Sequence, residues 1–342
     1  MTNSKKHFIL FFALLVALIV LFFINISLGS ISIPNEEILK GIFNQKMSKE
    51  SWEIIFYNFR LPKAFTAILV GMALSISGLL MQTLFRNPLA GPYVLGLSSG
   101  ASLGVAFVIL GASFLPVFLS EIFISSYGII LASGIGSSFV LMAVILVSKK
   151  LKDTMAILIV GLMFGSLTSA IVSVLTYFST AEQLQKFTFW SLGSLANLSW
   201  KEIGLLATLT FIGLGLSFLV IKPLDALLLG ERYANSLGVN FKKTRNIIII
   251  ATSILAGSIT AFVGPIAFIG LAVPHMAKLL FQTSNHLTLF WSTILLGAII
   301  LLFCDIIAQL PGSDLTLPIN AVTSMIGAPI VIWLLVRKRN FS

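Results

Sequence analysis

Long apolar runs recur along the whole 342-residue chain, and they constrain its fold more than any other feature. Hydrophobic residues make up 57% of the sequence and charged residues only 10%, whereas a soluble domain carries about a quarter charged residues. Because so few charges cannot cover a globule of this size, lipid and not water is expected to be the main solvent. A single cysteine, Cys304, permits no internal disulfide and no cysteine metal cluster. The composition predicts an all-α membrane protein and excludes an ordinary soluble enzyme, a disordered chain and a disulfide-stapled module.

About ten of these runs are long enough to be membrane-spanning helices, which need about 20 mainly apolar residues. The first run follows Lys5, Lys6 and His7, so a cleaved signal peptide is an alternative, but the run is longer than a signal core and lacks a clear cleavage site. No long polar domain fits between the runs, and we expect one transmembrane domain over residues 1–342. The predicted spans are residues 8–28, 61–83, 93–111, 127–148, 154–178, 203–221, 247–263, 268–281, 289–310 and 317–336.

The distribution of charge orients these spans. If the N-terminus is cytoplasmic and ten spans alternate, most basic residues fall on the cytoplasmic side, as the positive-inside rule requires, and the C-terminus is cytoplasmic too. The net charge of +10 is then explained by topology, so binding to nucleic acid need not be invoked. In this orientation residues 30–59 form an extracytoplasmic insert and residues 222–245 form a cytoplasmic loop.

No sequence motif indicates an enzyme. The chain has no GxxxxGK[ST] phosphate loop, no HExxH pair and no CxxC pair. Its three histidines, at positions 7, 275 and 286, lack the spacing of a metal site. We therefore predict no catalytic residue, no metal and no cofactor bound by this chain, which leaves transport or sensing at the bilayer.

Three segments interrupt the apolar pattern. Residues 87–100 and 264–275 are rich in proline and glycine, and backbone that leaves a helix at membrane depth is either buried in protein or lines an aqueous cavity. Paired breaks in the two halves indicate a transporter built from repeats, while two independent turns are the alternative. Residues 229–238 read as a short amphipathic helix in which Ala234 and Leu237 share a face and Gly238 ends the helix. Such a helix could be the binding site of a soluble partner. The alternative is that it is a solvent-exposed loop helix with no partner.

Taken together, the sequence resembles the permease subunits of type II ABC importers, the FecCD family that moves ferric siderophores, haem and vitamin B12. The resemblance covers most of the chain, in the family's order, from the second predicted span to the C-terminus. It rests on RLPK at 60–63, GLLMQTLFRNPLA at 78–90, LGLSSG at 95–100, LGERYANSLG at 229–238, FIGLAVPH at 268–275 and GAPIVIW at 327–333.

This resemblance implies a type II ABC importer permease of ten helices, in the bacterial cytoplasmic (inner) membrane, that pairs as a homodimer around the substrate pathway. Two separate ATPase subunits would bind ATP and Mg, and an extracytoplasmic substrate-binding protein would deliver the cargo. The implied function is ATP-driven import by alternating access of an iron chelate, either a ferric siderophore or haem, with cobalamin as a further candidate. An ion-coupled secondary transporter is the alternative; it needs several buried acids, and Asp305 is nearly alone in the predicted spans.

The resemblance also assigns roles to single residues. Arg60 and Lys63 stand where the family carries basic residues that pair with the binding protein, and such charges fix docking orientation and speed encounter. The sequence departs from the family at Lys63, where arginine is common, and at Gln309, where some members have another arginine. It also departs at residues 316–320 (TLPIN), where relatives often read ELPIG. The predicted translocation gate consists of Ser98, Ser99, Thr154 and Met155. The predicted ATPase contact consists of Gly230, Glu231, Arg232, Ala234, Leu237 and Gly238.

Two ionisable residues fall nearest the hydrocarbon, and an intramembrane charge is a functional hypothesis by default. We interpret Asp305 as a paired structural carboxylate, with a substrate contact as the alternative. We interpret His275 as a packing or hydrogen-bonding residue, with haem ligation as the alternative.

Overall fold

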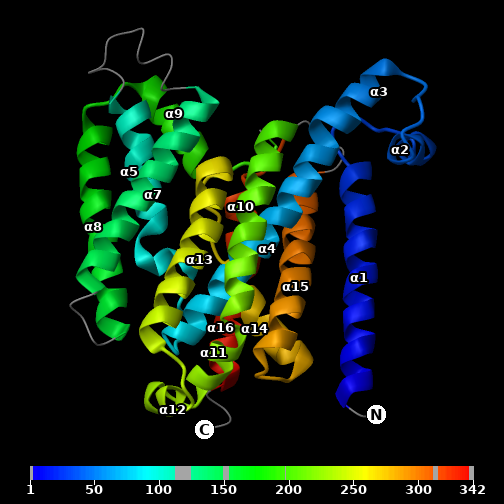
Figure 1. Cartoon of the computed structure of the whole chain (residues 1–342). Coiled ribbons are helices and arrows are strands. Elements are labelled where there is room, and N and C mark those ends of the chain that lie inside the picture. The colour runs from blue at the N-terminus through cyan, green and yellow to red at the C-terminus, as the bar shows by residue number, and fades with distance from the viewer. Residues whose placement is uncertain (1–2, 112–124, 149–153, 197, 311–314, 339–342) are drawn as a thin grey trace. The chain divides into compact units, whose positions relative to one another are not determined.

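The computed structural model describes residues 3–111, 125–148, 154–196, 198–310 and 315–338, and over these ranges the chain is helical and contains no strand (Figure 1). Among these described residues, seven helices are long and apolar enough to cross a membrane, and three shorter apolar helices, Leu97–Ile109, Ile269–Phe281 and Ile319–Trp333, accompany them. Each of these segments overlaps one of the predicted spans. The prediction of an all-α membrane protein with about ten spans is confirmed.

The described helices form two compact units. The first unit comprises Met1–Ile76, Ser194–Thr208 and Ile266–Ser342, and the second comprises Ser77–Gly193 and Leu209–Pro265. Two helices, α4 (Leu61–Leu84) and α10 (Trp200–Leu219), contribute to both units. That the whole chain acts as one permease domain stays a prediction.

In the first unit, α15 (His286–Ala308) packs against α1 (Asn3–Ser27), α14 (Ile269–Phe281) and α16 (Ile319–Lys338). The helix α4 approaches α15 closely, because a Cβ on either Gly71 or Gly297 would meet the backbone carbonyl of the other glycine. Small residues allow such backbone contact where lipid supplies no hydrophobic drive between helices. Two short helices, α2 (Asn35–Ile42) and α3 (Glu50–Ile55), occupy the segment predicted as an insert.

The two ends of α1 have different neighbours in this unit. Near its N-terminus, His7 Nε2 lies 3.0 Å from the carbonyl oxygen of Phe281, which ends α14. Near its C-terminus, Asn25 bonds to Asp305 in the last turn of α15. This arrangement matches the alternation predicted for these helices, which placed Lys6 and Asp305 on opposite sides.

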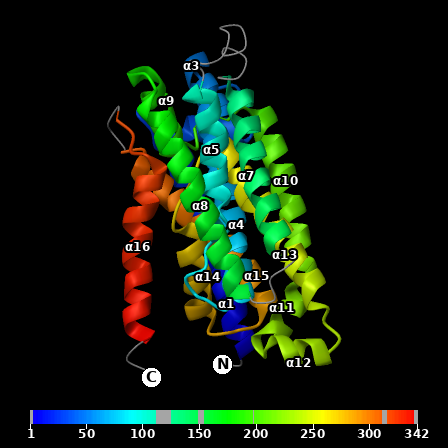
Figure 2. The same ribbon diagram turned by 90° about the vertical axis from the view of Figure 1, so that its left-hand side faces the viewer.

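The second unit is centred on α5 (Leu97–Ile109). Its neighbours are α7 (Ser126–Ser148), α8 (Thr154–Tyr177), α9 (Ala181–Ser191) and α13 (Phe241–Val263), and Figure 2 shows α5, α8 and α9 side by side. A cluster of fully buried apolar residues in α5, which includes Val105 and Ile109, packs against Phe187 and Trp190 of α9. Two short helices, α11 (Ile221–Leu228) and α12 (Glu231–Ser236), lead from α10 into α13.

The helices are broken at both predicted places. Residues 85–91 leave the α-helical pattern before a short 3-10 helix, Pro92–Leu95, and Gly96 has a positive φ of 75°. The second break is shorter than predicted, since it covers residues 264–268 and α14 continues through Pro274. Phe268 adopts the left-handed conformation with φ 67°, which is rare for a bulky residue.

Candidate functional site

A π-helix, Phe56–Arg60, leads directly into α4 and positions both cations that sequence reasoning assigned to docking. Short π-helical turns of this kind often mark functional positions. The backbone carbonyl of Tyr57 in this turn accepts a hydrogen bond from Trp200 Nε1 at 2.9 Å. The first residue of α10 therefore holds the turn that precedes α4.

Arg60 is only 8% exposed, and its guanidinium binds backbone oxygens at the end of α1. Nη1 donates to the carbonyls of Ile26 and Ser27 at 2.9 Å each, and Nη2 donates to the carbonyl of Ile31. The last carbonyls of a helix have no partner within it, and their partial negative charge favours a cation. A Cβ at Gly29 would lie 2.9 Å from Arg60 Nη2, so the glycine leaves room for the guanidinium. Arg60 thus closes the C-terminus of α1.

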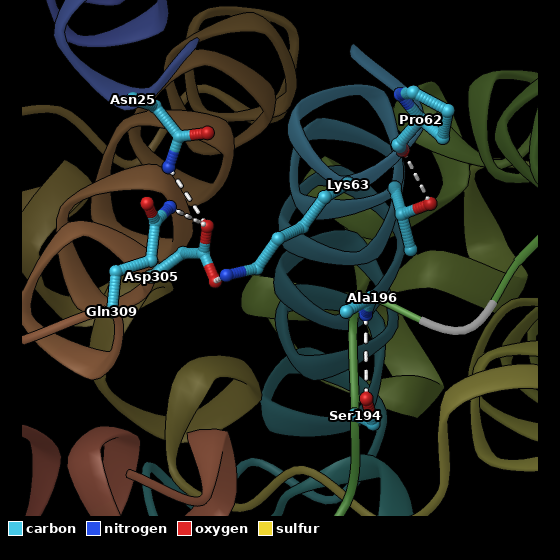
Figure 3. Close-up of polar contacts among 8 residues, drawn as sticks. Asn25, Pro62, Lys63, Ser194, Ala196, Asp305 and Gln309 are labelled. Carbon is cyan, nitrogen blue, oxygen red and sulfur yellow. Dashed lines mark hydrogen bonds and ion pairs between the residues drawn. The ribbon is translucent and has the colours of Figure 1, made fainter. Parts of the chain in front are cut away.

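Lys63 lies in the first turn of α4 and is paired with a buried carboxylate. Its Nζ is 3.0 Å from Asp305 Oδ1, with the lysine side chain 19% exposed and that of the aspartate 2% exposed. Asp305 Oδ2 also accepts hydrogen bonds from Asn25 Nδ2 at 2.8 Å and from Gln309 Nε2 at 2.9 Å (Figure 3). A buried charge costs little only when it is paired and hydrogen-bonded, and Asp305 has both kinds of partner. The interpretation of Asp305 as a paired carboxylate is confirmed.

Arg60, Lys63 and two of the partners of Asp305, Asn25 and Gln309, border a cavity of about 360 Å³ in the first unit. Its polar lining residues are Asn25, Ser30, Arg60, Lys63, Gln309 and Thr316. Lys63 is neutralised by Asp305, whereas the hydrogen-bond partners of Arg60 within the described residues are uncharged carbonyls. The cavity wall therefore carries one positive charge that no described carboxylate balances, which suits an anionic group.

Sequence reasoning missed Asn25, because an asparagine near the end of an apolar run gives no local signal. It also missed the role of Asn320, which was noted only as a departure from the family. Asn320 Oδ1 accepts the backbone N–H of Ala267 at 3.0 Å, directly before the left-handed Phe268. Asn320 thus links the residues directly before α14 to α16 within the first unit.

The predicted gate residues occupy two regions of the second unit. Ser98 and Ser99 lie half-buried in the first turn of α5, and a Cβ on Gly165 of α8 would be 3.3 Å from Ser99 Oγ. Thr154 and Met155 begin α8, and their side chains lie outside the described part of the chain. Residues 154 and 165 of one helix are separated by about 16 Å of helical rise. Within the unit the serines therefore lie beside the middle of α8 and not beside its start, and a gating role for the four residues stays a prediction.

The predicted ATPase contact forms a short helix, as expected. Helix α12 begins after Gly230, whose φ is 114°, and the chain turns again at Gly238, whose φ is 83°. Ala234 is fully buried, whereas Leu237, the C-cap residue after the helix ends at Ser236, is 58% exposed. Ala234 and Leu237 therefore do not form a common buried face, and Tyr233, 53% exposed, accompanies Leu237 on the surface. The side chains of Glu231 and Arg232 lie outside the described part.

The fold and these sites define a polytopic helical membrane protein with broken helices and a short polar helix between two spans. Comparison with known proteins gives the same class. The FecCD transport family matches residues 17–337. The hemin transport system permease protein HmuU of Yersinia pestis is 34% identical over 327 residues, which cover 95% of each chain. The vitamin B12 import system permease protein BtuC of Klebsiella pneumoniae subsp. pneumoniae is 34% identical over 329 residues, which cover 96% of this chain and 93% of the relative.

A solved structure extends the likeness to three dimensions. An inward-facing conformation of a metal-chelate type ABC transporter superposes with a TM-score of 0.83 at 29% identity, covering 96% of this chain and 99% of the other. The chain belongs to the FecCD transport family. It is a multi-pass membrane permease and not an enzyme.

Proposed function

We propose that this permease is the membrane subunit of a type II ABC importer that moves an iron chelate across the bacterial cytoplasmic membrane. Similar proteins include a hemin transport permease, a vitamin B12 import permease and a metal-chelate type ABC transporter, and they support this cargo class. Haem and ferric siderophores are the favoured cargoes, and cobalamin is the third candidate. An ion-coupled secondary transporter is disfavoured, because Asp305 is already neutralised by Lys63 and holds two amide hydrogen bonds.

The observation that carries the proposal is α12, a short helix with exposed Tyr233 and Leu237 that is bounded by two glycines with positive φ. It suits a contact with a soluble ATPase subunit that binds ATP and Mg. A homodimer with two such ATPase subunits would alternate between outward and inward openings, and no covalent step would occur on this chain. A short rigid helix is a suitable lever for turning ATPase closure into helix movement.

The cavity at the start of α4 is the proposed docking site of an extracytoplasmic binding protein. Arg60 supplies a positive charge that no described carboxylate balances, and it lies at the cavity wall. Lys63 contributes less charge than the sequence suggests, because Asp305 neutralises it. An acidic side chain of the partner would therefore face mainly Arg60, with the amide of Gln309 as a neutral donor.

Reconstitution tests the proposal directly. The permease is placed in proteoliposomes with its ATPase, and uptake of labelled hemin, a ferric siderophore and cobalamin is measured with and without ATP and the binding protein. We expect uptake of one cargo that requires both. Uptake driven by an ion gradient without ATP would instead establish the secondary transporter.

Two sets of variants test the assigned surfaces. Arg60→Gln keeps an amide donor for the end of α1 but removes the charge, so it should abolish stimulation of the ATPase by the binding protein while basal ATPase activity persists. If the binding protein stimulates the ATPase of this variant as strongly as that of the wild type, the docking assignment is wrong. Exchange of Tyr233 and Leu237 for serine should leave the permease folded but abolish its binding to the ATPase in pull-downs. If the ATPase still binds, the proposed role of α12 as the ATPase contact is contradicted.

A further inference from the structure

The guanidinium of Arg86 links the end of α4 to the hinge that precedes α12. Arg86 follows α4 by two residues, and its Nη2 donates a hydrogen bond to the carbonyl oxygen of Leu227 at 2.9 Å. Both residues belong to the second unit. The Arg86 backbone has a positive φ of 46°, a conformation that few residues other than glycine adopt. Such a backbone persists only where surrounding contacts hold it.

The acceptor lies at the point where the chain leaves α11. Leu227 is in the last turn of α11, and its carbonyl also accepts the N–H of Gly230 at 3.1 Å. Gly230 has φ 114° and ψ 149°, a backbone region that is essentially restricted to glycine. A Cβ at Gly230 would lie 3.8 Å from Arg86 Nη2. The guanidinium therefore rests against the hinge between α11 and α12, where its charge also complements the C-terminal end of α11.

On its other side, Arg86 opens the non-helical segment that leads to α5. The N–H of Asn87 bonds to the carbonyl of Gln82 at 3.2 Å, and Asn87 Oδ1 accepts the N–H of Leu89 at 2.9 Å. The N–H of Ala90 bonds to the carbonyl of Asn87 at 3.0 Å. These bonds tie residues 85–90 into a compact turn before the 3-10 helix and the first turn of α5. A displacement of the hinge at Gly230 would be passed to this turn through the Arg86 side chain.

We propose that Arg86 is a positioning residue that transmits movement of α12 to residues 85–91 and to the start of α5. The inference rests on the proposed function of α12 as the ATPase contact. It adds a physical connection between the surface that receives the ATPase and the broken segment within the same unit. The hydrogen bond is directional, with one donor and one acceptor, so shifting the hinge moves or breaks it.

The test uses the full permease–ATPase complex in nanodiscs and needs no cargo. Hydrogen exchange is measured in residues 85–91 with and without a non-hydrolysable ATP analogue. We expect the wild-type exchange rate to change severalfold on addition of the nucleotide, and the Arg86→Gln complex to show less than a third of that change. Lys242→Gln, which removes an exposed charge from the first turn of α13, is the matched control and should respond as wild type.

A second measurement gives each result a clear meaning. In proteoliposomes with hemin as the probe cargo, Arg86→Gln should keep ATPase binding and hydrolysis but transport at least tenfold less hemin per ATP, and Arg86→Lys should recover part of the loss. If Arg86→Gln transports as much hemin per ATP as the wild type, the inference is overturned. It is also overturned if hydrogen exchange in the wild-type complex does not change on addition of the nucleotide, and this second result does not depend on whether a variant folds. If the Tyr233 and Leu237 variants retain the ATPase, the proposed function of α12 fails instead, and the two failures are thereby distinguished.

Discussion

Lys63 Nζ lies 3.0 Å from Asp305 Oδ1, an ion pair that joins the start of α4 to the last turn of α15. Asn25 of α1 donates to the other carboxylate oxygen, so three helices of the first unit meet at one side chain. A lysine that sequence comparison assigns to the surface therefore has an internal partner. The pair links the stability of the first unit to the charge of its cavity.

Replacement of Lys63 by methionine should destabilise the protein more than replacement of Asp305 by asparagine. The first change leaves a 2% exposed carboxylate without a countercharge, and breaking a buried pair in this way costs about 3–5 kcal/mol. The second change leaves a lysine that lines the cavity and can turn into it. The free energy of unfolding in detergent checks this order. The double variant Lys63→Met with Asp305→Leu should recover most of the loss, and Lys186→Gln, which breaks the exposed pair with Glu182, should change nothing measurable. Equal losses in the two single variants would contradict the argument.

Replacement of Arg60 by alanine should loosen the end of α1. The change removes three charged hydrogen bonds to backbone carbonyls. A hydrogen bond to a charged group contributes about 1.5–3 kcal/mol, and we expect a loss in that range because water can reach part of this segment. Amide exchange in residues 24–31 should rise, whereas exchange near His7 at the other end of α1 should not. A rise along the whole helix would show that Arg60 does not act at its C-terminus.

Replacement of Gly71 by alanine should separate α4 from α15. The added Cβ would meet the carbonyl of Gly297, and overpacking of this kind costs about 1–3 kcal/mol. Gly204 on α10 is the matched control, since a Cβ there meets no atom of the described residues within 4 Å. Gly204→Ala should be neutral or should stabilise by about 0.5–1 kcal/mol, because glycine weakens a helix interior. If both variants unfold at the same denaturant concentration, the close approach of α4 and α15 at Gly71 does not contribute to stability.

The segment around α2 should loosen in acid. The Glu37 carboxylate accepts hydrogen bonds from the Lys40 side chain and then from the Ser48 side chain and backbone, which lower its pKa from 4.5 to about 2. Because the pKa is lower in the folded chain, this carboxylate contributes stability above about pH 4.5, and the contribution is lost as the pH falls toward 2. Exchange of the Ser48 amide, corrected for its intrinsic rate, should rise over that range. Glu37→Gln should show the faster exchange already at pH 6 and no further dependence on this carboxyl group; a steep acid transition in this variant would assign the effect elsewhere.

The spans could be predicted from the sequence because lipid forces every backbone group to bond within its own helix. Each span is therefore a single long apolar run that can be recognised in the sequence. The helix α12 could be predicted for a similar local reason, since Gly230 and Gly238 bound a short polar segment. The interaction partners of Arg60, Lys63 and Arg86 could not be predicted from the sequence. They lie far away in the chain, and several are main-chain oxygens that carry no residue-specific signal. The motif singled out Arg60 and Lys63, whose docking role stays a prediction, and only the fold shows what neutralises or holds each charge.

Arg60 and Arg86 share a property that affects how this protein can diverge. Arg60 binds three backbone carbonyl oxygens and Arg86 binds one, and every amino acid at positions 26, 27, 31 or 227 would supply such an oxygen equally. Substitution at those positions therefore needs no compensating change at the arginine, and paired variation would not reveal the contact. Insertions or deletions that shift one helix end against the other are the changes to which these contacts are sensitive. Evolution is thus expected to conserve the lengths of the connecting segments at these two contacts more strictly than the identities of their residues.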